Sequence, residues 1–429
     1  MKTRMWWSCS LAVLGAAFIN SHAQQRTAPT KAKTATVPPA AAASFDWPQW
    51  RGPNRDGISS ETGLLKTWPA SGPKVLWRAG SGEGYSGIVV SRGRGFTSYG
   101  VGNNEVVVAF GASTGKELWR AIIDDKFEND QGNGPRSTPT VDGEVLFALS
   151  AQSHLVALSV KDGKKIWEHD LRAEYGGRIP RWGVSTVPLV EGNMLLVDVG
   201  GKSGHSVMAF NKTNGAVIWK SETDVPGYSA PIAVTVNGMR KILAFTGTAL
   251  VGLAANDGKS LWRYTWETEY DVNAATPVFI APDKVFIASD YGKGSALLQM
   301  QTNNGKAGVR EVWRGREMKN HFSSSVLYQN HLYGFDDAFL TCLDLATGTP
   351  KWQQRGFNKG SLLFADGHLV VLGERGNLAL VEASPASYRE KARVQILNGR
   401  CWTMPTLANG KLYLRNQKEM LCLDANGKN

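Results

Sequence analysis

Residues 106–120 read VVVAFGASTGKELWR, and this pattern returns at intervals along the chain. Its copies are HLVALSVKDGKKIWE at 154–168, SVMAFNKTNGAVIWK at 206–220, ALVGLAANDGKSLWR at 249–263 and FLTCLDLATGTPKWQ at 339–353. Alternating apolar residues before the turn indicate a strand with one buried face. The Asn-Gly, Asp-Gly and Thr-Gly pairs supply the positive φ angles of a tight β-hairpin turn. Each copy therefore predicts two antiparallel strands, the second of which carries a tryptophan.

Tryptophan marks this repeat over a longer part of the chain than the full pattern does. The marker residues recur about every 40 to 50 residues, a spacing typical of a four-stranded propeller blade. They are Trp77, Trp119, Trp167, Trp219, Trp262, Trp313 and Trp352. This regular return of aromatic residues beside glycine turns predicts an all-β propeller.

A second series of short apolar segments predicts the innermost strand of each blade. Its members begin as YSGIVV at 85, RSTPTV at 136, VSTVPLV at 184, YSAPIAV at 228, AATPVFI at 274, FSSSVLY at 322, GSLLFAD at 360 and WTMPTLA at 402. We therefore expect an eight-bladed β-propeller of four-stranded antiparallel blades. The predicted outer strand of the seventh blade, ARVQIL at 392–397, has no tryptophan, so seven blades remain the alternative.

The chain ends inside the last predicted blade. The third strand of this blade covers residues 420–424, and too few residues follow to make a fourth. The strand around Val75–Trp77 precedes the first blade and has no sheet of its own. We expect it to complete the last blade, because this pairing closes the ring and removes two exposed sheet edges.

The N-terminal region predicts export. Residues 1–23 combine Lys2 and Arg4 with an apolar run and small residues at the cleavage side, as in a signal peptide, and contain no lipobox. We therefore expect a periplasmic or secreted protein. The expected divisions are a signal peptide at 1–23, a low-complexity linker at 24–44 and a propeller at 45–429, with a lead-in segment at 45–73 and blades at 74–424.

Composition argues against several classes of partner. The net charge of +11 overstates the charge of the propeller, because residues 1–44 carry Lys and Arg but no Asp or Glu. No nucleic-acid-binding module occurs, so we expect no nucleic-acid partner. We also expect no transmembrane segment and a monomer. Cys342, Cys401 and Cys422 form no obvious disulfide framework and are expected to be buried free thiols.

These features resemble the pyrroloquinoline-quinone (PQQ)-like repeat, A-x-D-x-x-T-G-x-x-x-W. The lead-in sequence FDWPQWRGPNRDGISSETGLLKTWP at 45–69 resembles the start of exported bacterial PQQ-like propellers, many described as BamB-like or polyvinyl-alcohol-dehydrogenase-like. In that family the tryptophan docks on neighbouring blades beside a small residue and a turn glycine. The matching sets are Trp119 with Ala109 and Gly115, Trp167 with Ala157 and Gly163, Trp219 with Ala209 and Gly215, and Trp262 with Gly252 and Gly258.

The resemblance leaves the function open between three classes. Quinoprotein dehydrogenases of this family bind PQQ with Ca²⁺ on the axis, and many carry adjacent cysteines or a CxxCH haem motif. This chain contains neither motif. We therefore expect a non-enzymatic BamB-like scaffold that binds an envelope protein or a small or polymeric ligand. The alternatives are a PQQ/Ca²⁺-dependent dehydrogenase acting on an alcohol, sugar or polymer, and an extracellular polysaccharide- or polymer-binding propeller.

The candidate site lies in the loops that precede the inner strands, because these loops share one face around the axis. Their residues would form an aromatic and cationic ring suited to a planar or anionic ligand. The residues are Tyr85, Arg136, Trp182, Tyr228, Asn273, His321, Lys359 and Trp402. Loops between second and third strands add Glu374, Arg375 and Arg415, with His205, Asp290, Tyr291, Asp336 and Asp337 beside them. No histidine pair has metal-ligand spacing, so no metal site is expected. The lead-in segment is expected to act as a structural clasp.

Overall fold

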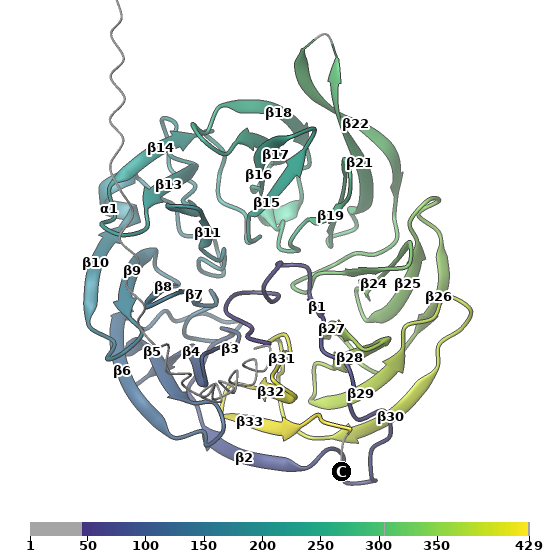
Figure 1. Cartoon of the computed structure of the whole chain (residues 1–429). Helices are drawn as coiled ribbons and strands as arrows, with labels where there is room; N and C mark the ends of the chain where they lie inside the picture. Colours follow the sequence, from purple (N-terminus) through teal and green to yellow (C-terminus); the bar gives the residue numbers. More distant parts are fainter. Residues whose placement is uncertain (1–44, 304, 428–429) are drawn as a thin grey trace, which may run out of the picture. The chain divides into compact units, whose positions relative to one another are not determined.

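The computed structural model describes residues 45–303 and 305–427 and arranges them as eight blades around an axis (Figure 1). The predicted signal peptide at 1–23 and linker at 24–44 lie outside the described residues. Within the described residues, no helix combines the length and apolar character needed to cross a membrane.

The first four blades are four-stranded antiparallel sheets that follow one another along the chain. Blade 1 comprises β3 (Val89–Ser91), β4 (Arg94–Val101), β5 (Asn104–Gly111) and β6 (Glu117–Asp125), and blade 2 comprises β7 (Thr140–Asp142), β8 (Val145–Leu149), β9 (His154–Ser159) and β10 (Lys165–Asp170). Blade 3 comprises β11 (Leu189–Glu191), β12 (Met194–Asp198), β13 (Val207–Asn211) and β14 (Val217–Ser221), and blade 4 comprises β15 (Ile232–Val236), β16 (Met239–Phe245), β17 (Ala249–Ala254) and β18 (Ser260–Thr265). The short helices are α1 (Leu171–Tyr175) and η1 (Glu269–Asp271).

The last four blades complete the ring and confirm the prediction of eight. Blade 5 comprises β19 (Val278–Ile280), β20 (Lys284–Ser289), β21 (Gly294–Asn303) and β22 (Lys306–Gly315), and blade 6 comprises β23 (Val326–Tyr328), β24 (His331–Asp336), β25 (Phe339–Asp344) and β26 (Pro350–Gln354). Blade 7 comprises β27 (Ser361–Ala365), β28 (His368–Leu372), β29 (Asn377–Glu382) and β30 (Glu390–Gln395), with β1 (Ile58–Ser59) parallel to β27. Blade 8 comprises β31 (Thr406–Ala408), β32 (Lys411–Arg415), β33 (Glu419–Asp424) and β2 (Val75–Gly80). The seven-bladed alternative is wrong.

The ring closes as predicted. Strand β2 pairs antiparallel with β33, so that Val75 lies opposite Leu423 and Trp77 lies opposite Cys422. The segment before blade 1 thereby supplies the outer strand of blade 8. This pairing removes the two free edges that an open ring would leave.

The seventh blade is complete although it lacks a marker tryptophan. At the equivalent point of the other blades, a small residue such as Ala109 usually faces the tryptophan, here Trp119. In blade 7 the sizes are exchanged, because Leu380 on β29 faces Ala392 on β30. The exchange keeps a large and a small side chain at this point, which suits a close-packed interior.

Each marker indole bridges two blades. Trp77 donates its indole N–H to the carbonyl of Ala112, and Trp119 donates to that of Val160, both in the following blade. The same bond runs from Trp167 to Lys212, from Trp219 to Ala255, from Trp313 to Leu345 and from Trp352 to Ser384. The exception is Trp262, whose buried indole nitrogen has no partner among the described residues. The hairpin it faces, between β21 and β22, is longer than the others.

The glycine assignments taken from the family pattern need a correction. Ala109 does lie opposite Trp119, as that pattern implies. The glycine beside the indole, however, belongs to the following blade and not to the same hairpin. A Cβ on Gly115 would lie 2.6 Å from the ring of Trp77, and one on Gly163 would lie 2.6 Å from that of Trp119. Likewise Gly215 meets Trp167 and Gly258 meets Trp219. The turn glycine of each of these hairpins therefore contacts the tryptophan of the preceding blade.

The lead-in segment crosses the axis and contacts every blade (Figure 1, purple). Its contacts with blades 1 to 4 join Trp47 to Val90, Pro48 to Val141, and Arg55 to Val187, Pro188 and Pro231. Its contacts with blades 5 to 8 join Trp50 to Thr276, Arg51 to Ser325, β1 to β27 and Glu61 to Gly410. This segment therefore fills the axis at the level of the inner strands, as a clasp that holds all eight blades.

The docking of indole on glycine predicts different effects of alanine at two glycines with similar backbone angles. Gly115 has φ +66° and Gly143 has φ +61°, but only Gly115 has an indole within reach of an added Cβ. Both changes carry the backbone strain of about 1–2 kcal/mol expected for a left-handed residue. Gly115→Ala also overpacks Trp77 and should lower the free energy of unfolding by about 1–3 kcal/mol more. Urea unfolding of the two variants measures this difference, and equal losses would contradict indole docking.

Replacing Arg55 tests how much the lead-in segment contributes to the free energy of unfolding. Its guanidinium donates to three carbonyls at the axis. In Arg55→Ala the carbonyl of Pro188 keeps the hydroxyl of Thr140 as a donor. Those of Val187 and Pro231 lose the donor that Arg55 supplied. Because unsatisfied buried groups are destabilising by about 1–3 kcal/mol each, two such carbonyls should lower the free energy of unfolding by at least about 2 kcal/mol. Arg92→Ala, at an exposed arginine that pairs with Glu144, is the control and should change the unfolding free energy by less than about 1 kcal/mol.

Candidate functional site

A pocket of about 340 Å³ opens on the face where the inner strands begin. Most of its lining residues come from the loops between successive blades and from the lead-in segment, and Tyr291 comes from the turn between β20 and β21. The lining residues are Trp50, Tyr85, Gln131, Arg136, Thr138, Trp182, Ser185, Val187, Tyr228, Ala230, Val272, Ala274, Tyr291, His321, Phe322 and Trp402. The set is rich in aromatic rings, has one cationic side chain and contains no carboxylate.

Aromatic rings follow one another around the mouth of the pocket, and we call this set the aromatic rim. Its members are Tyr85, Trp402, Phe322, His321, Tyr291, Tyr270 and Trp182. Successive ring centroids lie 5.1, 5.0, 5.8, 5.7, 5.8 and 5.8 Å apart in that order. These separations fall in the range of favourable aromatic pairs, so each ring helps to hold its neighbours.

Arg136 closes the circuit between the two ends of the aromatic rim. Its guanidinium carbon lies 5.6 Å from the ring centroid of Tyr85, and its Nε donates to the carbonyl of Trp182 at 2.7 Å. On its other side the ring of Phe127 lies 4.8 Å away. Burial lowers the pKa of Arg136, and the surrounding carbonyls and rings hold the cation in place.

Two rings of the rim stand on strained backbone. Tyr270 has φ 61° and Tyr291 has φ 58°, in the left-handed region that residues with a side chain rarely adopt. Strain of this kind persists where the surroundings over-determine it, and it is common at binding sites. It turns both phenol rings toward the pocket mouth, where they contact each other.

The floor of the pocket is Trp50 of the lead-in segment. Its indole donates to Thr276 Oγ1 at 3.0 Å, which fixes the ring beneath the aromatic rim. The sequence reasoning treated this segment only as a clasp and missed its part in the pocket. Phe322, Tyr270 and Gln131 were also missed. Trp50 is the second tryptophan of the WPQW sequence and does not belong to the marker series of the blades. This unexplained tryptophan was the signal in the sequence that could have indicated a role in the pocket.

The structure brings six of the predicted site residues together at the pocket. These are Tyr85, Arg136, Trp182, Tyr228, His321 and Trp402. Glu374 lies behind them and accepts the indole N–H of Trp402 at 2.8 Å. Lys359 lies at the edge and pairs with Asp290 and Asp337 at 3.3 and 3.1 Å.

The remaining predicted residues lie elsewhere. Asn273 is fully buried, and its amide donates to the carbonyls of Thr246, Gly247 and Trp266. Arg415 is also fully buried and joins blade 8 to blade 1 through the carbonyls of Ser86, Ser98 and Gly82. Arg375 is exposed and outside the lining. Of the second loop set, Tyr291 lines the pocket, Asp336 pairs with Lys319, and His205 contacts Lys220.

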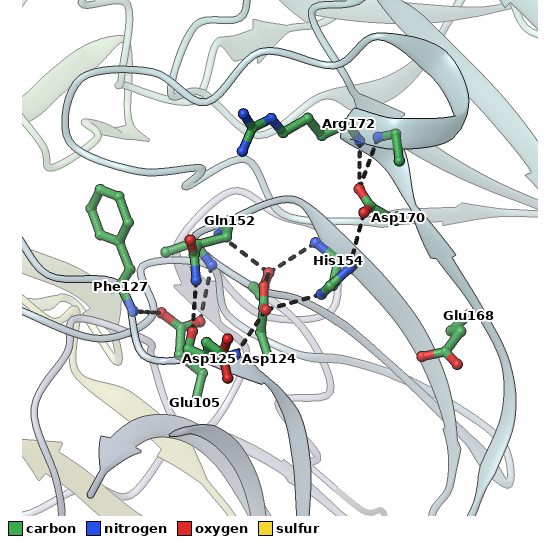
Figure 2. A network of polar contacts seen from close by, with 12 residues as sticks. Glu105, Asp124, Asp125, Phe127, Gln152, His154, Glu168, Asp170 and Arg172 are labelled. Atoms are coloured by element: carbon green, nitrogen blue, oxygen red, sulfur yellow. Dashed lines mark hydrogen bonds and ion pairs between the residues drawn. The ribbon is translucent and has the colours of Figure 1, made fainter. Parts of the chain in front are cut away.

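Figure 2 shows a polar network around the buried carboxylate of Glu105 that includes the backbone N–H of Phe127. The ring of Phe127 in turn lies against Arg136. The Glu105 carboxylate accepts the backbone N–H of Ala151 at 3.0 Å and that of Phe127 at 3.3 Å, so it ties blade 2 to blade 1. Beside it, His154 lies between Asp124 and Asp170, at 3.0 and 3.4 Å. Desolvation raises the pKa of Glu105 to about 7, and the charge of Asp124 adds to the shift while that of Arg136 opposes it.

The donor set of the pocket does not fit PQQ with Ca²⁺. Calcium takes six to eight oxygen ligands, with carboxylates prominent among them. The pocket lining has no Asp or Glu, and the described part of the chain has no group of three His, Cys, Asp or Glu placed to hold a metal ion. The axis below is filled by the lead-in segment. No catalytic step through this cofactor follows from these residues.

Fold and pocket together define a PQQ-repeat propeller with a pocket lined by aromatic side chains over a filled axis. The family model described as outer membrane protein assembly factor BamB matches residues 69–179 and 103–354. The chain belongs to this family. It is 23% identical over 383 residues to the outer membrane protein assembly factor BamB of Shewanella oneidensis, covering 82% of this chain and 88% of that protein.

Other comparisons agree on the fold. The BamB of Yersinia pestis is 21% identical over 367 residues, covering 80% of this chain and 86% of the relative. The crystal structure of BamB from Moraxella catarrhalis has a TM-score of 0.57 at 14% identity and covers 82% of this chain and 99% of its own. A quinohemoprotein alcohol dehydrogenase from Pseudomonas putida has a TM-score of 0.58 at 11% identity, covering 90% and 81%. At these identities the two structures establish the propeller fold alone.

Glu105 predicts how stability depends on pH. Its pKa is about 7 in the folded protein against an ordinary 4.5, so the folded state keeps a proton that the unfolded chain releases. The stability it contributes is present below about pH 4.5 and is lost as the pH rises through about 7. Glu105→Gln removes this loss, so its unfolding free energy relative to the natural protein should rise by about 2–3 kcal/mol between about pH 5 and pH 8.

Urea unfolding at a series of pH values measures this effect. Glu117→Gln is the control, because it removes an exposed carboxylate from β6 of the same blade. A Glu105→Gln variant with the same pH slope as the natural protein would show that Glu105 does not take up the proton.

Proposed function

We propose that this protein is a non-enzymatic scaffold of the bacterial envelope that serves outer-membrane protein assembly by holding a partner protein at the aromatic-rim pocket. Family membership and the names of the relatives support the assembly role. The observation that carries the binding role is the closed aromatic rim above an axis filled by the chain's own lead-in segment. Such a pocket offers contact surface and no reactive group.

The proposal includes export and a monomeric state. The predicted signal peptide at 1–23 would deliver the propeller to the periplasm, where envelope partners are found. The remaining members of the site, Lys359 and Glu374, would act by fixing the rim, since both are engaged with neighbouring side chains. A dehydrogenase is not favoured, because the pocket lining offers no carboxylate ligand for Ca²⁺.

Deletion of the gene in the bacterium that carries it tests the proposal. We expect the steady-state amount of outer-membrane proteins to fall and a plasmid copy of the natural protein to restore it, as measured by quantitative proteomics of outer-membrane fractions. A periplasmic protein unrelated to assembly is the control for export in general. Unchanged outer-membrane proteins would overturn the assembly role, and PQQ- and Ca²⁺-dependent dye reduction by the purified protein would overturn the non-enzymatic role.

A further inference from the structure

We propose that the pocket receives one bulky apolar side chain, such as phenylalanine, from an extended segment of the partner protein, and that acidic residues of this segment lie against the arginines of the rim. This inference rests on the proposed function and specifies what the partner presents to the site.

The interior of the pocket suits an apolar group because its polar atoms are already used. Ser185 Oγ donates to the carbonyl of Tyr228 at 2.8 Å, and Thr138 Oγ1 accepts the N–H of Gly87 at 2.8 Å. The phenol of Tyr228 accepts the N–H of Trp182 at 3.4 Å. Of the buried polar side-chain atoms in the lining, His321 Nδ1 alone lacks a partner among the described residues.

This arrangement disfavours a sugar polymer. A sugar presents several hydroxyl groups, and burying hydroxyls without hydrogen bonds is unfavourable by several kcal/mol. Among the buried polar side-chain atoms of the lining, only His321 Nδ1 is left to satisfy them. An aromatic or aliphatic side chain makes no such demand and gains from contact with the surrounding rings.

The size of the pocket suits a single side chain. Its volume of about 340 Å³ lies at the small end of the range for ligand sites, about 300–1,000 Å³. Protein partners commonly bind through a few large side chains that enter desolvated pockets, surrounded by weaker contacts. The ring of Trp50 beneath and the aromatic rim around it form such a pocket.

Arginines at the mouth give the site its charge preference. Arg181 lies over the rings of Trp182 and Tyr270 at 5.2 and 5.3 Å, and Arg400 lies over Trp402 at 4.4 Å. Both are exposed, and in the described chain neither forms an ion pair with a carboxylate. They remain able to attract and hydrogen-bond carboxylates of a bound segment.

Three carboxylates near the mouth are engaged with neighbouring groups. Asp290 and Asp337 pair with Lys359, and Glu374 binds the indole of Trp402. Glu269 hydrogen-bonds the phenol of Tyr270, so the mouth also carries an acidic group on that side. Arg181 and Arg400, which form no ion pair in the described chain, distribute positive charge along the rim at Trp182 and Trp402. An acidic segment with an apolar anchor complements this distribution in both charge and shape.

Three synthetic peptides test the inference on the full-length mature protein by isothermal titration calorimetry. They are acetylated and amidated pentapeptides with the sequences Asp-Glu-Phe-Glu-Asp, Asp-Glu-Ala-Glu-Asp and Lys-Lys-Phe-Lys-Lys. We expect the first to bind at least about tenfold more tightly than the second, since one anchored ring contributes more than about 1.4 kcal/mol. We also expect it to bind at least about tenfold more tightly than the third, because Arg181 and Arg400 attract its acidic residues and repel lysines. Equal binding of the Phe and Ala peptides, or tighter binding of the basic peptide, would overturn the inference.

Variants of the pocket and its rim test whether the acidic Phe peptide binds there. Ala274→Phe fills the pocket without removing a wall, and Trp182→Ala removes part of the rim; each should weaken the acidic Phe peptide at least about tenfold. Arg400→Gln should weaken it about threefold and reduce its salt dependence. The matched control is Arg389→Gln, an exposed arginine in the loop between β29 and β30, on the other face of the ring. Circular dichroism and thermal unfolding verify that each variant is folded.

Two further measurements separate the possible failures. Competition by cellohexaose against the peptide would replace the protein partner with a sugar polymer and overturn the inference. In the deletion strain, full restoration of outer-membrane proteins by folded Ala274→Phe would overturn the pocket inference while the assembly function stands. A deletion strain with unchanged outer-membrane proteins would instead overturn the assembly function, whatever the peptides do. Loss of restoration together with loss of peptide binding would support both.

Discussion

The hydrogen bonds of Arg51 and Arg55 at the axis are the interaction on which the rest of the structure depends. The loops before the inner strands converge there, and their carbonyls need donors once they are removed from water. Arg55 reaches three such carbonyls in blades 3 and 4, while Arg51 reaches Ser325 of blade 6. A guanidinium offers five N–H donors in a fixed plane, so one short segment can serve carbonyls on several sides. Burial lowers the pKa of Arg55 to about 9, and the charge is retained at neutral pH.

This clasp also determines where a ligand can bind. The lead-in segment occupies the axis among the inner strands, and its Trp50 is part of the lining of the pocket, held by its bond to Thr276. The loops before the inner strands then form the walls, and their rings hold one another through the circuit that ends at Arg136. Glu105 and Phe127 stand behind that arginine, so the pocket wall and the contact between blades 1 and 2 share one network. Stability of the ring and shape of the pocket are therefore coupled.

Much of the fold could be predicted because its determinants repeat. The alternation of strands, the glycine turns and the marker tryptophans gave eight blades and the pairing of β2 with β33. Blade 7 was harder to recognise because Leu380 and Ala392 exchange the usual large and small positions. The glycine contacts were assigned to the wrong blade, since a one-dimensional pattern does not tell whether an indole at a blade edge faces its own hairpin or the next one.

The site was predicted less completely, and the reason is that loop side chains follow no period. Position before an inner strand places a residue near the axis but does not fix its direction. Tyr85 and Trp402 turn into the pocket, whereas Asn273, in an equivalent position, turns inward to satisfy three carbonyls. Tyr270 belongs to the rim because its backbone adopts a left-handed conformation, which no pattern in the sequence predicted. Trp50 is distant in sequence from the other lining residues and reaches them only because the chain crosses the axis.

The filled axis also explains why a shared fold with quinohemoprotein dehydrogenases does not carry a shared chemistry. A ring of eight four-stranded blades leaves a central space, and what occupies that space is free to differ between proteins with the same blades. Here it is occupied by the chain itself, through buried arginines and a tryptophan, and the residues left facing solvent are aromatic rings with unpaired arginines at the mouth. Contact surface and charge are what such residues supply, and both suit recognition of a partner better than turnover of a substrate.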